Sequence, residues 1–240
     1  MTVNWPLPIE WLPANGGPAE QLILLLHGGA SNGAAMAPLA QALRAQFPQA
    51  ALLAPDAPLP SPDGPALRQW FAHQAGNDDN RAGCEADVLG PVWDWVRHSQ
   101  QRLCVGPAAT AIAGFSQGAI VALETALAQD GLAGRVLAFS GRFISTALQR
   151  APQHTTVHLF HGGADAVIAS QHSSQALKTL GALHGDATLD IAQGVGHELH
   201  PALIARALFR LRNHIPARTW AAALGGIASA PPPPLPGKEH

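Results

Sequence analysis

Short apolar runs alternate along this chain with longer stretches of helical periodicity. The predicted strands are Gln21–Leu26, Ala50–Ala54, Thr110–Phe115, Arg135–Ser140, Thr156–Phe160 and Ala187–Ala192. The predicted helices, each of which follows a strand directly or across a loop, are Ala34–Gln46, Glu85–Gln101, Gln117–Ala128, Ala169–Leu180 and Glu198–Asn213. This alternation predicts an α/β fold: a doubly wound, mostly parallel sheet flanked by helices, whose ligands bind at the carboxyl ends of the strands.

Three segments interrupt the alternation. Ile9–Leu12 is expected to add an antiparallel edge strand. Pro55–Gly83 is rich in Pro, Asp, Gly and Asn without a clear period, which predicts a long functional or irregular loop. The proline run within Ala230–His240 excludes helix and strand, and it predicts a solvated extension or, as an alternative, a ligand for a proline-recognising domain. We therefore expect one domain over residues 1–220, without a large lid, and a flexible Ala/Gly/Pro-rich tail over residues 221–240.

The composition narrows the possible classes of function. Hydrophobic residues make up 47% of the 240 residues and charged residues 12%, with a formal net charge of −2. Such a chain can bury a core, and it lacks the basic surface typical of nucleic-acid-binding proteins. Leu22–Leu26, the main early apolar run, is too short for a membrane span or a signal core, so we expect no stable membrane insertion. The protein is accordingly expected to be cytoplasmic, with Cys84 and Cys104 as unpaired thiols without a catalytic role.

The sequence GFSQG, Gly114–Gly118, lies between a predicted strand and a predicted helix. A serine hydroxyl is a weak nucleophile, so an enzyme that uses one must expose it and supply a base and an oxyanion site. In a strand-to-helix elbow the residues two before and two after the serine must be very small, because the two backbones pass close together. Gly114 and Gly118 satisfy this condition. The context favours Ser116 as a nucleophile over an ordinary serine in a glycine turn.

Two later strand ends supply the other residue types that a serine nucleophile needs. In this architecture the acid and the histidine follow the serine along the chain in that order. Asp165 follows the fifth predicted strand, and His197 follows the sixth, just before the last helix. Asp186 and Asp190 are less suitable, because Asp186 precedes its strand and Asp190 lies within it. We therefore predict Ser116, Asp165 and His197 as the catalytic residues.

The histidines also permit other interpretations. His197, Glu198 and His200 bring two histidines near a carboxylate, but their spacing is not H-E-x-x-H and no third ligand is evident. We expect neither a metal ion nor a cofactor. His27 and His161 precede glycine turns and are expected to form local hydrogen bonds.

The oxyanion of an acyl-transfer intermediate needs two hydrogen-bond donors. The sequence LILLLHGGASNG ends a predicted strand at His27, and the loop that follows is expected to face the elbow. The helix that begins at Gln117 directs its free amide groups and its positive dipole end at the same point. We predict that the backbone amides of Gly29 and Gln117 are the two donors.

The ordered motifs HGG, GFSQG, HGGAD and GVGHEL resemble the α/β-hydrolase superfamily, in particular its small carboxylesterase, lysophospholipase and acyl-protein thioesterase group. The resemblance covers about Gln21–Arg212 and implies the same catalytic residues and oxyanion amides. It also implies that Trp70 and Phe71, within RQWF, lie near the mouth of the site and bind substrate, with local packing of the loop as an equal alternative. The chain departs from the usual family pattern at Ala30–Asn32 and at Gly163, so no substrate is carried over from the resemblance.

Together these residues predict a cofactor-free serine hydrolase that cleaves carboxylic esters with short to medium acyl chains through an acyl-enzyme. A thioesterase or a lysophospholipase would use the same three residues, and acyl transfer to an alcohol would use the same acyl-enzyme. A non-catalytic binding protein on a hydrolase scaffold is a rival of another class, disfavoured because all three residue types are present. The expected partner is a small-molecule ester, and the sequence leaves the oligomeric state open.

Overall fold

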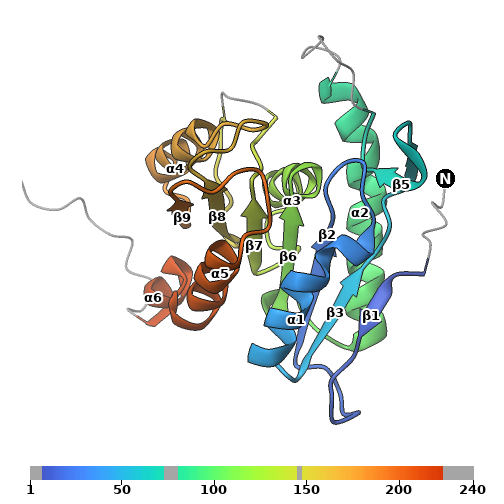
Figure 1. Ribbon diagram of the computed structural model, residues 1–240. Helices are drawn as coiled ribbons and strands as arrows, with labels where there is room; N and C mark the ends of the chain where they lie inside the picture. Colours follow the sequence, from blue (N-terminus) through green and yellow to red (C-terminus); the bar gives the residue numbers. More distant parts are fainter. Residues whose placement is uncertain (1–6, 73–80, 145–147, 224–240) are drawn as a thin grey trace, which may run out of the picture.

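A seven-stranded sheet forms the centre of the fold (Figure 1). The computed structural model describes residues 7–72, 81–144 and 148–223. The strands lie in the order β1-β3-β2-β6-β7-β8-β9. β1 pairs antiparallel with β3, and the other neighbours pair in parallel, so the predicted α/β fold and its edge strand are confirmed. The bounds are β1 Ile9–Trp11, β2 Gln21–Leu26, β3 Ala50–Ala54, β6 Thr110–Phe115, β7 Arg135–Phe139, β8 Thr156–Gly162 and β9 Ala187–Ala192.

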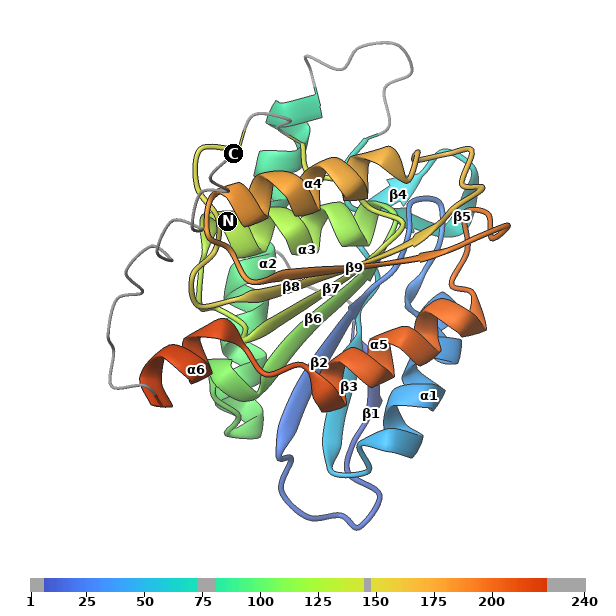
Figure 2. The same cartoon turned by 90° about the vertical axis from the view of Figure 1, so that its left-hand side faces the viewer.

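Helices cover both faces of this sheet (Figure 2). α2, α3 and α4 pack on one face, and α1 and α5 pack on the other. The side chains of β2 alternate between the two layers: Leu22, Leu24 and Leu26 join the first, while Ile23 and Leu25 join the second. Because both faces of β2 are buried, the strand is an uninterrupted apolar run. The bounds are α1 Ala37–Gln46, α2 Arg81–Leu103, α3 Gln117–Ala128, α4 Gln171–Ala182, α5 Pro201–Asn213 and α6 Ala217–Ala223.

Several elements begin or end away from their predicted bounds for local reasons. α5 begins at Pro201 instead of Glu198, because the His200 ring accepts a hydrogen bond from a helix amide and proline suits the first turn. β7 ends one residue early because Ser140 has φ of 49°, which a strand residue does not adopt. α6 was not predicted, and it contains residues 221–223, which the sequence had placed in the tail. The rest of the predicted tail lies outside the described residues.

The segment Pro55–Gly83 contains more regular structure than expected. β4, Leu59–Ser61, and β5, Gly64–Gln69, form an antiparallel hairpin. The backbones of Ser31 and Arg68 exchange hydrogen bonds of 3.2 and 2.7 Å, which tie this hairpin to the loop after β2. The prediction of an irregular loop is therefore wrong for these residues. The strands are short and contain prolines, so they lack the period that sequence analysis detects.

Two smaller expectations concern the membrane and the thiols. Within the described ranges, none of the helices combines the length and apolarity that crossing a membrane requires. Cys104 is exposed and is not in a disulfide. The side chain of Cys84 lies outside the described part of the chain.

Candidate active site

Ser116 occupies a sharp turn between β6 and α3. Its φ of 52° and ψ of −117° are rare for a residue with a side chain, and its amide donates to the carbonyl oxygen of Phe139 at 3.0 Å. The flanking glycines are required by close backbone contacts. A Cβ added to Gly114 would lie 2.2 Å from the carbonyl oxygen of Gly118, and one added to Gly118 would lie 2.2 Å from that of Leu26. The predicted strand, serine and helix arrangement is therefore present.

The side chains of Ser116, His197 and Asp165 form a continuous hydrogen-bonded line. The Oγ of Ser116 lies 2.9 Å from Nε2 of His197, and Nδ1 of the same ring lies 2.8 Å from Oδ2 of Asp165. Since a carboxylate oxygen accepts, Nδ1 carries the proton in this pairing and Nε2 is available to accept the serine hydroxyl proton. The three residues come from the ends of β6, β8 and β9, which the parallel sheet brings to one edge.

Asp165 is held in position by its own loop. Its Oδ1 accepts hydrogen bonds of 2.9 Å from the amides of both Val167 and Ile168. Burial acts to raise the pKa of the Asp165 carboxyl, but the Ile168 amide, the His197 ring and the Val167 amide outweigh it and hold that pKa below its ordinary value. Asp165 is therefore a carboxylate at neutral pH, and it has one oxygen directed at His197.

His197 also packs against an aromatic ring. The centroids of the Phe115 and His197 rings lie 4.9 Å apart at a tilt of 43°. His197 is partly exposed, with 16% of its side chain accessible, so the Ser116 end of the line lies near solvent. In the sequence, His200 is a possible metal partner of His197. In the structure the His200 ring accepts a hydrogen bond from the Ala202 amide at the start of α5.

The loop after β2 lies directly against the elbow. A Cβ added to Gly28 would lie 3.5 Å from Cβ of Ser116, and one added to Gly29 would lie 2.7 Å from Cδ of Gln117. Among the described residues, no protein acceptor receives the backbone amide of Gly29 or of Gln117. The loop of Gly29 is thus in contact with the elbow, and the two amides predicted to be oxyanion donors have no protein acceptor among the described residues.

Trp70 and Phe71 occupy a different environment from the one predicted. Their side chains are only 1% and 3% exposed and belong to the core beneath the hairpin. The indole Nε1 of Trp70 donates to the carbonyl oxygen of His27 at 2.7 Å. The side chain of Gln117 accepts from the Trp70 amide at 3.1 Å and donates to the Phe71 carbonyl oxygen at 3.2 Å. The low exposure of both side chains favours the alternative, local packing of the loop, and substrate binding by these two residues stays a prediction.

His27 supports the same loop from below. Its Nε2 accepts the Ala57 amide at 2.9 Å, so Nδ1 carries the proton and donates to the Gly28 carbonyl oxygen at 2.6 Å. Burial lowers the pKa of this imidazole, which favours the neutral ring that the two bonds require. The expected local hydrogen bond is present, but the contact with Ala57, thirty residues away, could not be seen in the sequence.

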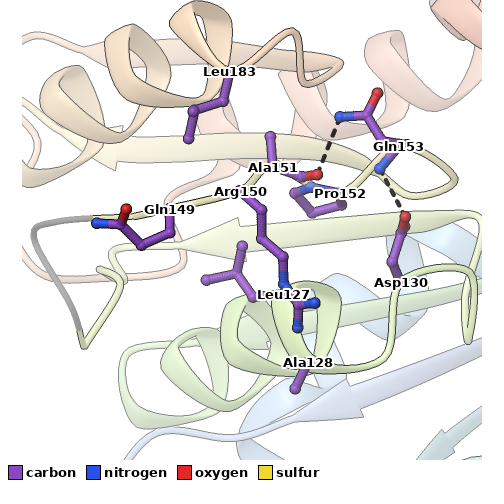
Figure 3. A pocket seen from close by; sticks show the side chains of 9 residues that line it. All are labelled: Leu127, Ala128, Asp130, Gln149, Arg150, Ala151, Pro152, Gln153 and Leu183. Carbon is purple, nitrogen blue, oxygen red and sulfur yellow. Dashed lines mark hydrogen bonds between the residues drawn. The ribbon is translucent and has the colours of Figure 1, made fainter.

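A surface hollow of about 440 Å³ lies at the far end of α3 (Figure 3). In Figure 3 the side chain of Arg150 extends toward Ala128, and Asp130 accepts the amide of Gln153 at 2.8 Å. The 12 residues of α3 span about 18 Å at 1.5 Å per residue, which separates this hollow from Ser116 at the other end of the helix. The hollow is lined by Leu127, Ala128, Asp130, Gln149, Arg150, Ala151, Pro152, Gln153 and Leu183.

Comparisons with known proteins agree with this geometry. The family model described as phospholipase/carboxylesterase matches residues 10–215. Esterase YpfH of Escherichia coli strain K12 is 41% identical over 210 residues, which cover 87% of this chain and 89% of that protein. Acyl-protein thioesterase 1 of Eremothecium gossypii is 26% identical over 90% of this chain and 96% of its own length.

A solved structure gives the same result for the fold. The crystal structure of esterase PE8 superposes with a TM-score of 0.80 at 31% identity, and the match covers 87% of this chain and 99% of that one. The matched family model spans most of the chain and includes every strand that carries a site residue. The chain therefore belongs to the phospholipase/carboxylesterase family, and it is a carboxylic ester hydrolase with the α/β-hydrolase fold.

Proposed function

We propose that this hydrolase cleaves esters of short to medium acyl chains through an acyl-enzyme on Ser116, with His197 as general base and Asp165 as its orienting acid. In the first half-reaction Oγ of Ser116 attacks the ester carbonyl carbon while Nε2 of His197 takes the hydroxyl proton. The imidazolium then returns this proton to the leaving alcohol as the carbon–oxygen bond breaks. Water repeats the sequence on the acyl-enzyme and releases the carboxylic acid.

The amides of Gly29 and Gln117 have the role of holding the oxyanion of each tetrahedral intermediate. Gln117 follows Ser116 directly, Gly29 lies in the loop that contacts the elbow, and neither amide has a protein acceptor among the described residues. Removing one such donor typically costs a factor of about 10² to 10³ in kcat. The positive end of the α3 dipole adds to the same stabilisation.

The observation that carries this proposal is the line from Asp165 through His197 to Ser116, with hydrogen bonds of 2.8 and 2.9 Å. The buried Ser140 also has a positive φ, of 49°, so the turn alone does not distinguish a nucleophile. Ser116 differs because its hydroxyl group lies 2.9 Å from an imidazole that Asp165 orients. Gly114 and Gly118 maintain the turn, because a Cβ added to either one would lie 2.2 Å from a backbone oxygen. The strained backbone of Ser116 therefore occurs together with an oriented base, which is the geometry that a serine nucleophile needs.

The preference for short to medium acyl chains rests on the architecture. The described part of the chain has no large domain inserted between its strands, and its one additional hairpin, β4–β5, is bonded to the loop after β2 through Ser31 and Arg68. Within the described ranges, no inserted domain adds an apolar cover that a long acyl chain could bind. We therefore expect the rate to be highest for small acyl groups.

The first test is hydrolysis of p-nitrophenyl acetate, butyrate and octanoate by the wild type and by Ser116→Ala at about pH 8, where an unperturbed imidazole is neutral. We expect kcat to be lower by about 10³-fold or more in the variant. We expect the wild type to prefer acetate or butyrate over octanoate. A serine-directed fluorophosphonate should label the wild type once, at Ser116. Equal rates in both proteins would contradict the role of Ser116, and a preference for octanoate would contradict the substrate range.

A thioesterase is the second candidate, because the relative from Eremothecium gossypii is named as an acyl-protein thioesterase. The same catalytic line would serve, since only the leaving group changes. Butyrylcholine and butyrylthiocholine form a matched pair that differs in one atom. A kcat/KM for the thioester more than about tenfold above that for the oxygen ester would favour this second function.

A further inference from the structure

His161 is a buried histidine beside Asp165 that the reaction above does not use. It lies near the end of β8 and its side chain is fully inaccessible. Its Nε2 lies 2.7 Å from the carbonyl oxygen of Ile168 and 3.4 Å from Oδ2 of Asp165. On the other side of the ring, Nδ1 lies 2.7 Å from Oγ of Ser173 in α4. The ring therefore stands between the Asp165 loop and the helix that follows it.

The partners of His161 fix its tautomer. A carbonyl oxygen can only accept, so Nε2 carries a proton and donates to Ile168. Burial lowers the pKa of His161, so the ring is neutral and Nδ1 accepts the hydroxyl proton of Ser173. A neutral ring presents an N–H dipole to Oδ2 of Asp165 without adding a positive charge that would compete with His197 for the carboxylate.

These bonds make a continuous connection from α4 to the catalytic line. Ser173 donates to His161, which donates to the carbonyl group of Ile168. The amide of Ile168 donates in turn to Oδ1 of Asp165, and Oδ2 of Asp165 accepts from His197. The turn that cradles the Asp165 carboxylate is therefore closed on its far side by the His161 ring.

We propose that His161 is a positioning residue: it holds the turn Asp165–Ile168 so that the Asp165 carboxylate keeps Oδ2 on His197. This inference rests on the proposed function, since it assigns to His161 an effect on the same reaction. It predicts that the loss of the ring changes kcat and the pH profile and leaves the substrate-binding step largely unchanged, because His161 faces Asp165 and not Ser116.

The experiment compares wild type with His161→Leu, His161→Gln and Ser173→Ala in the hydrolysis of p-nitrophenyl butyrate. Leucine removes both hydrogen bonds. Glutamine keeps an N–H that can reach the Ile168 carbonyl group. We expect kcat to fall by about 30- to 100-fold in His161→Leu, by less than about tenfold in His161→Gln and by about two- to fivefold in Ser173→Ala, with KM within about twofold in each.

The pH profile separates positioning from mere packing. If Asp165 loses its orientation, it stabilises the His197 imidazolium less well, so the acidic limb of kcat/KM should move to lower pH by about 0.5 or more in His161→Leu. A packing role would leave the midpoint of that limb in place. His158 serves as the matched control, because it is also fully buried in β8 and bonds to Thr188 away from the site. His158→Gln should keep kcat within about twofold.

The outcomes distinguish this inference from the proposed function. If Ser116→Ala is inactive while folded His161→Leu keeps kcat within about twofold, the positioning role is overturned and the proposed function stands. A lower kcat with an unmoved acidic limb, equal in His161→Leu and His161→Gln, would also overturn it. If His161→Leu does not fold, the graded loss in His161→Gln and Ser173→Ala, with the displaced limb, still decides the question. An active Ser116→Ala would instead contradict the proposed function.

Discussion

Two Asp–His pairs of nearly equal length lie at opposite ends of the sheet. At the carboxyl ends of the strands, Asp165 and His197 are 2.8 Å apart. At the amino ends, Asp186 and His214 are 2.9 Å apart. The two pairs differ in what lies on their other sides. The first continues to the hydroxyl group of Ser116, whereas the ring of His214 packs at a right angle to another imidazole, with the centroids 5.1 Å apart.

The remaining oxygen of Asp186 also distinguishes the two ends. It accepts from the Thr156 hydroxyl at 2.7 Å and from the Ala217 amide at 3.2 Å, so it fastens α6 to the start of β8. Burial acts to raise the pKa of Asp186, but Thr156, Ala217 and His214 outweigh it and hold that pKa below the ordinary value. A short Asp–His bond therefore does not by itself identify a catalytic pair. The strained serine and the unpartnered amides near it make the difference.

The largest expected effect comes from changing one carboxylate of each pair to an amide. Asp165→Asn should lower kcat by about 10⁴-fold, because the amide no longer fixes the tautomer of His197 or stabilises its cation. Asp186→Asn should keep kcat within about twofold and lower the free energy of unfolding by about 1–3 kcal/mol. Hydrolysis of p-nitrophenyl butyrate and urea denaturation measure the two effects. A folded Asp186→Asn protein with a large loss of kcat would break the distinction between the ends.

The next effect tests the two ends of β6. Gly114→Ala places a Cβ 2.2 Å from a backbone oxygen of α3, so it should destabilise the protein by more than about 3 kcal/mol and abolish turnover. Gly106, just before the amino end of β6, is the matched control: its φ of −77° suits alanine, and no atom lies within 4 Å of an added Cβ. The free energy of unfolding of Gly106→Ala should lie within about 0.5 kcal/mol of the wild-type value. Equal stability of the two variants in thermal denaturation would show that the elbow can relax.

A smaller effect should appear in the pH dependence of stability at the amino end. Burial is the main reason that the pKa of His158 falls to about 3, from an ordinary value of about 6.5. Below pH 6.5 His158 binds a proton in the unfolded chain but stays neutral in the folded protein. The contribution of His158 to the free energy of unfolding is therefore greatest above this pH and falls as the pH is lowered toward 3.

Urea denaturation at a series of pH values measures this contribution. For one proton the slope approaches about 1.4 kcal/mol per pH unit between about pH 5.5 and 4. His27 and His161, whose pKa values burial also lowers, add in the same direction. His158→Asn should therefore reduce the slope by up to this amount, with kcat within about twofold at pH 8. If the slope of unfolding free energy against pH is the same in His158→Asn as in wild type, the proton is taken up by the other histidines and not by His158.

The smallest effect concerns a carboxylate that has no histidine partner. Asp190 in β9 accepts hydrogen bonds from Arg206 at 2.7 Å and from Arg210 at 2.8 Å, both on α5. Because the guanidinium groups are partly exposed, solvent screens the pairs, and Asp190→Asn should cost only about 1 kcal/mol in thermal unfolding with no change in kcat. A loss of activity without unfolding would indicate that α5 transmits strain to His197.

Much of this structure could be predicted from the sequence because its signals are local. Buried strands such as β2 and β6 are continuous apolar runs, and their bounds were predicted to the residue. The positions of Ser116, Asp165 and His197 follow from strand ends, which a parallel sheet brings to one edge. Their roles stay a prediction for the experiments above. α6 and the β4–β5 hairpin were missed, since each is short and has no extended periodicity.

The contacts that support the site could not be predicted in the same way. His27 with Ala57, Gln117 with Trp70, and His161 with Ser173 join residues that are distant or on different elements, and no pattern of composition announces them. Trp70 shows the limit most clearly. An aromatic residue near the site could either contact substrate or fill the core, and its 1% exposure, which favours the core, could not be read from the sequence.

The side chain of Gln117 has a consequence for how this enzyme can vary. Its amide recognises the backbone N–H of Trp70 and the backbone carbonyl group of Phe71, and neither bond depends on which side chains those positions carry. The hairpin β4–β5, which ends just before these two residues, can therefore change its exposed side chains while the backbone bonds to the nucleophile turn remain. The glutamine of GFSQG allows the surroundings of the site to diverge without moving Ser116.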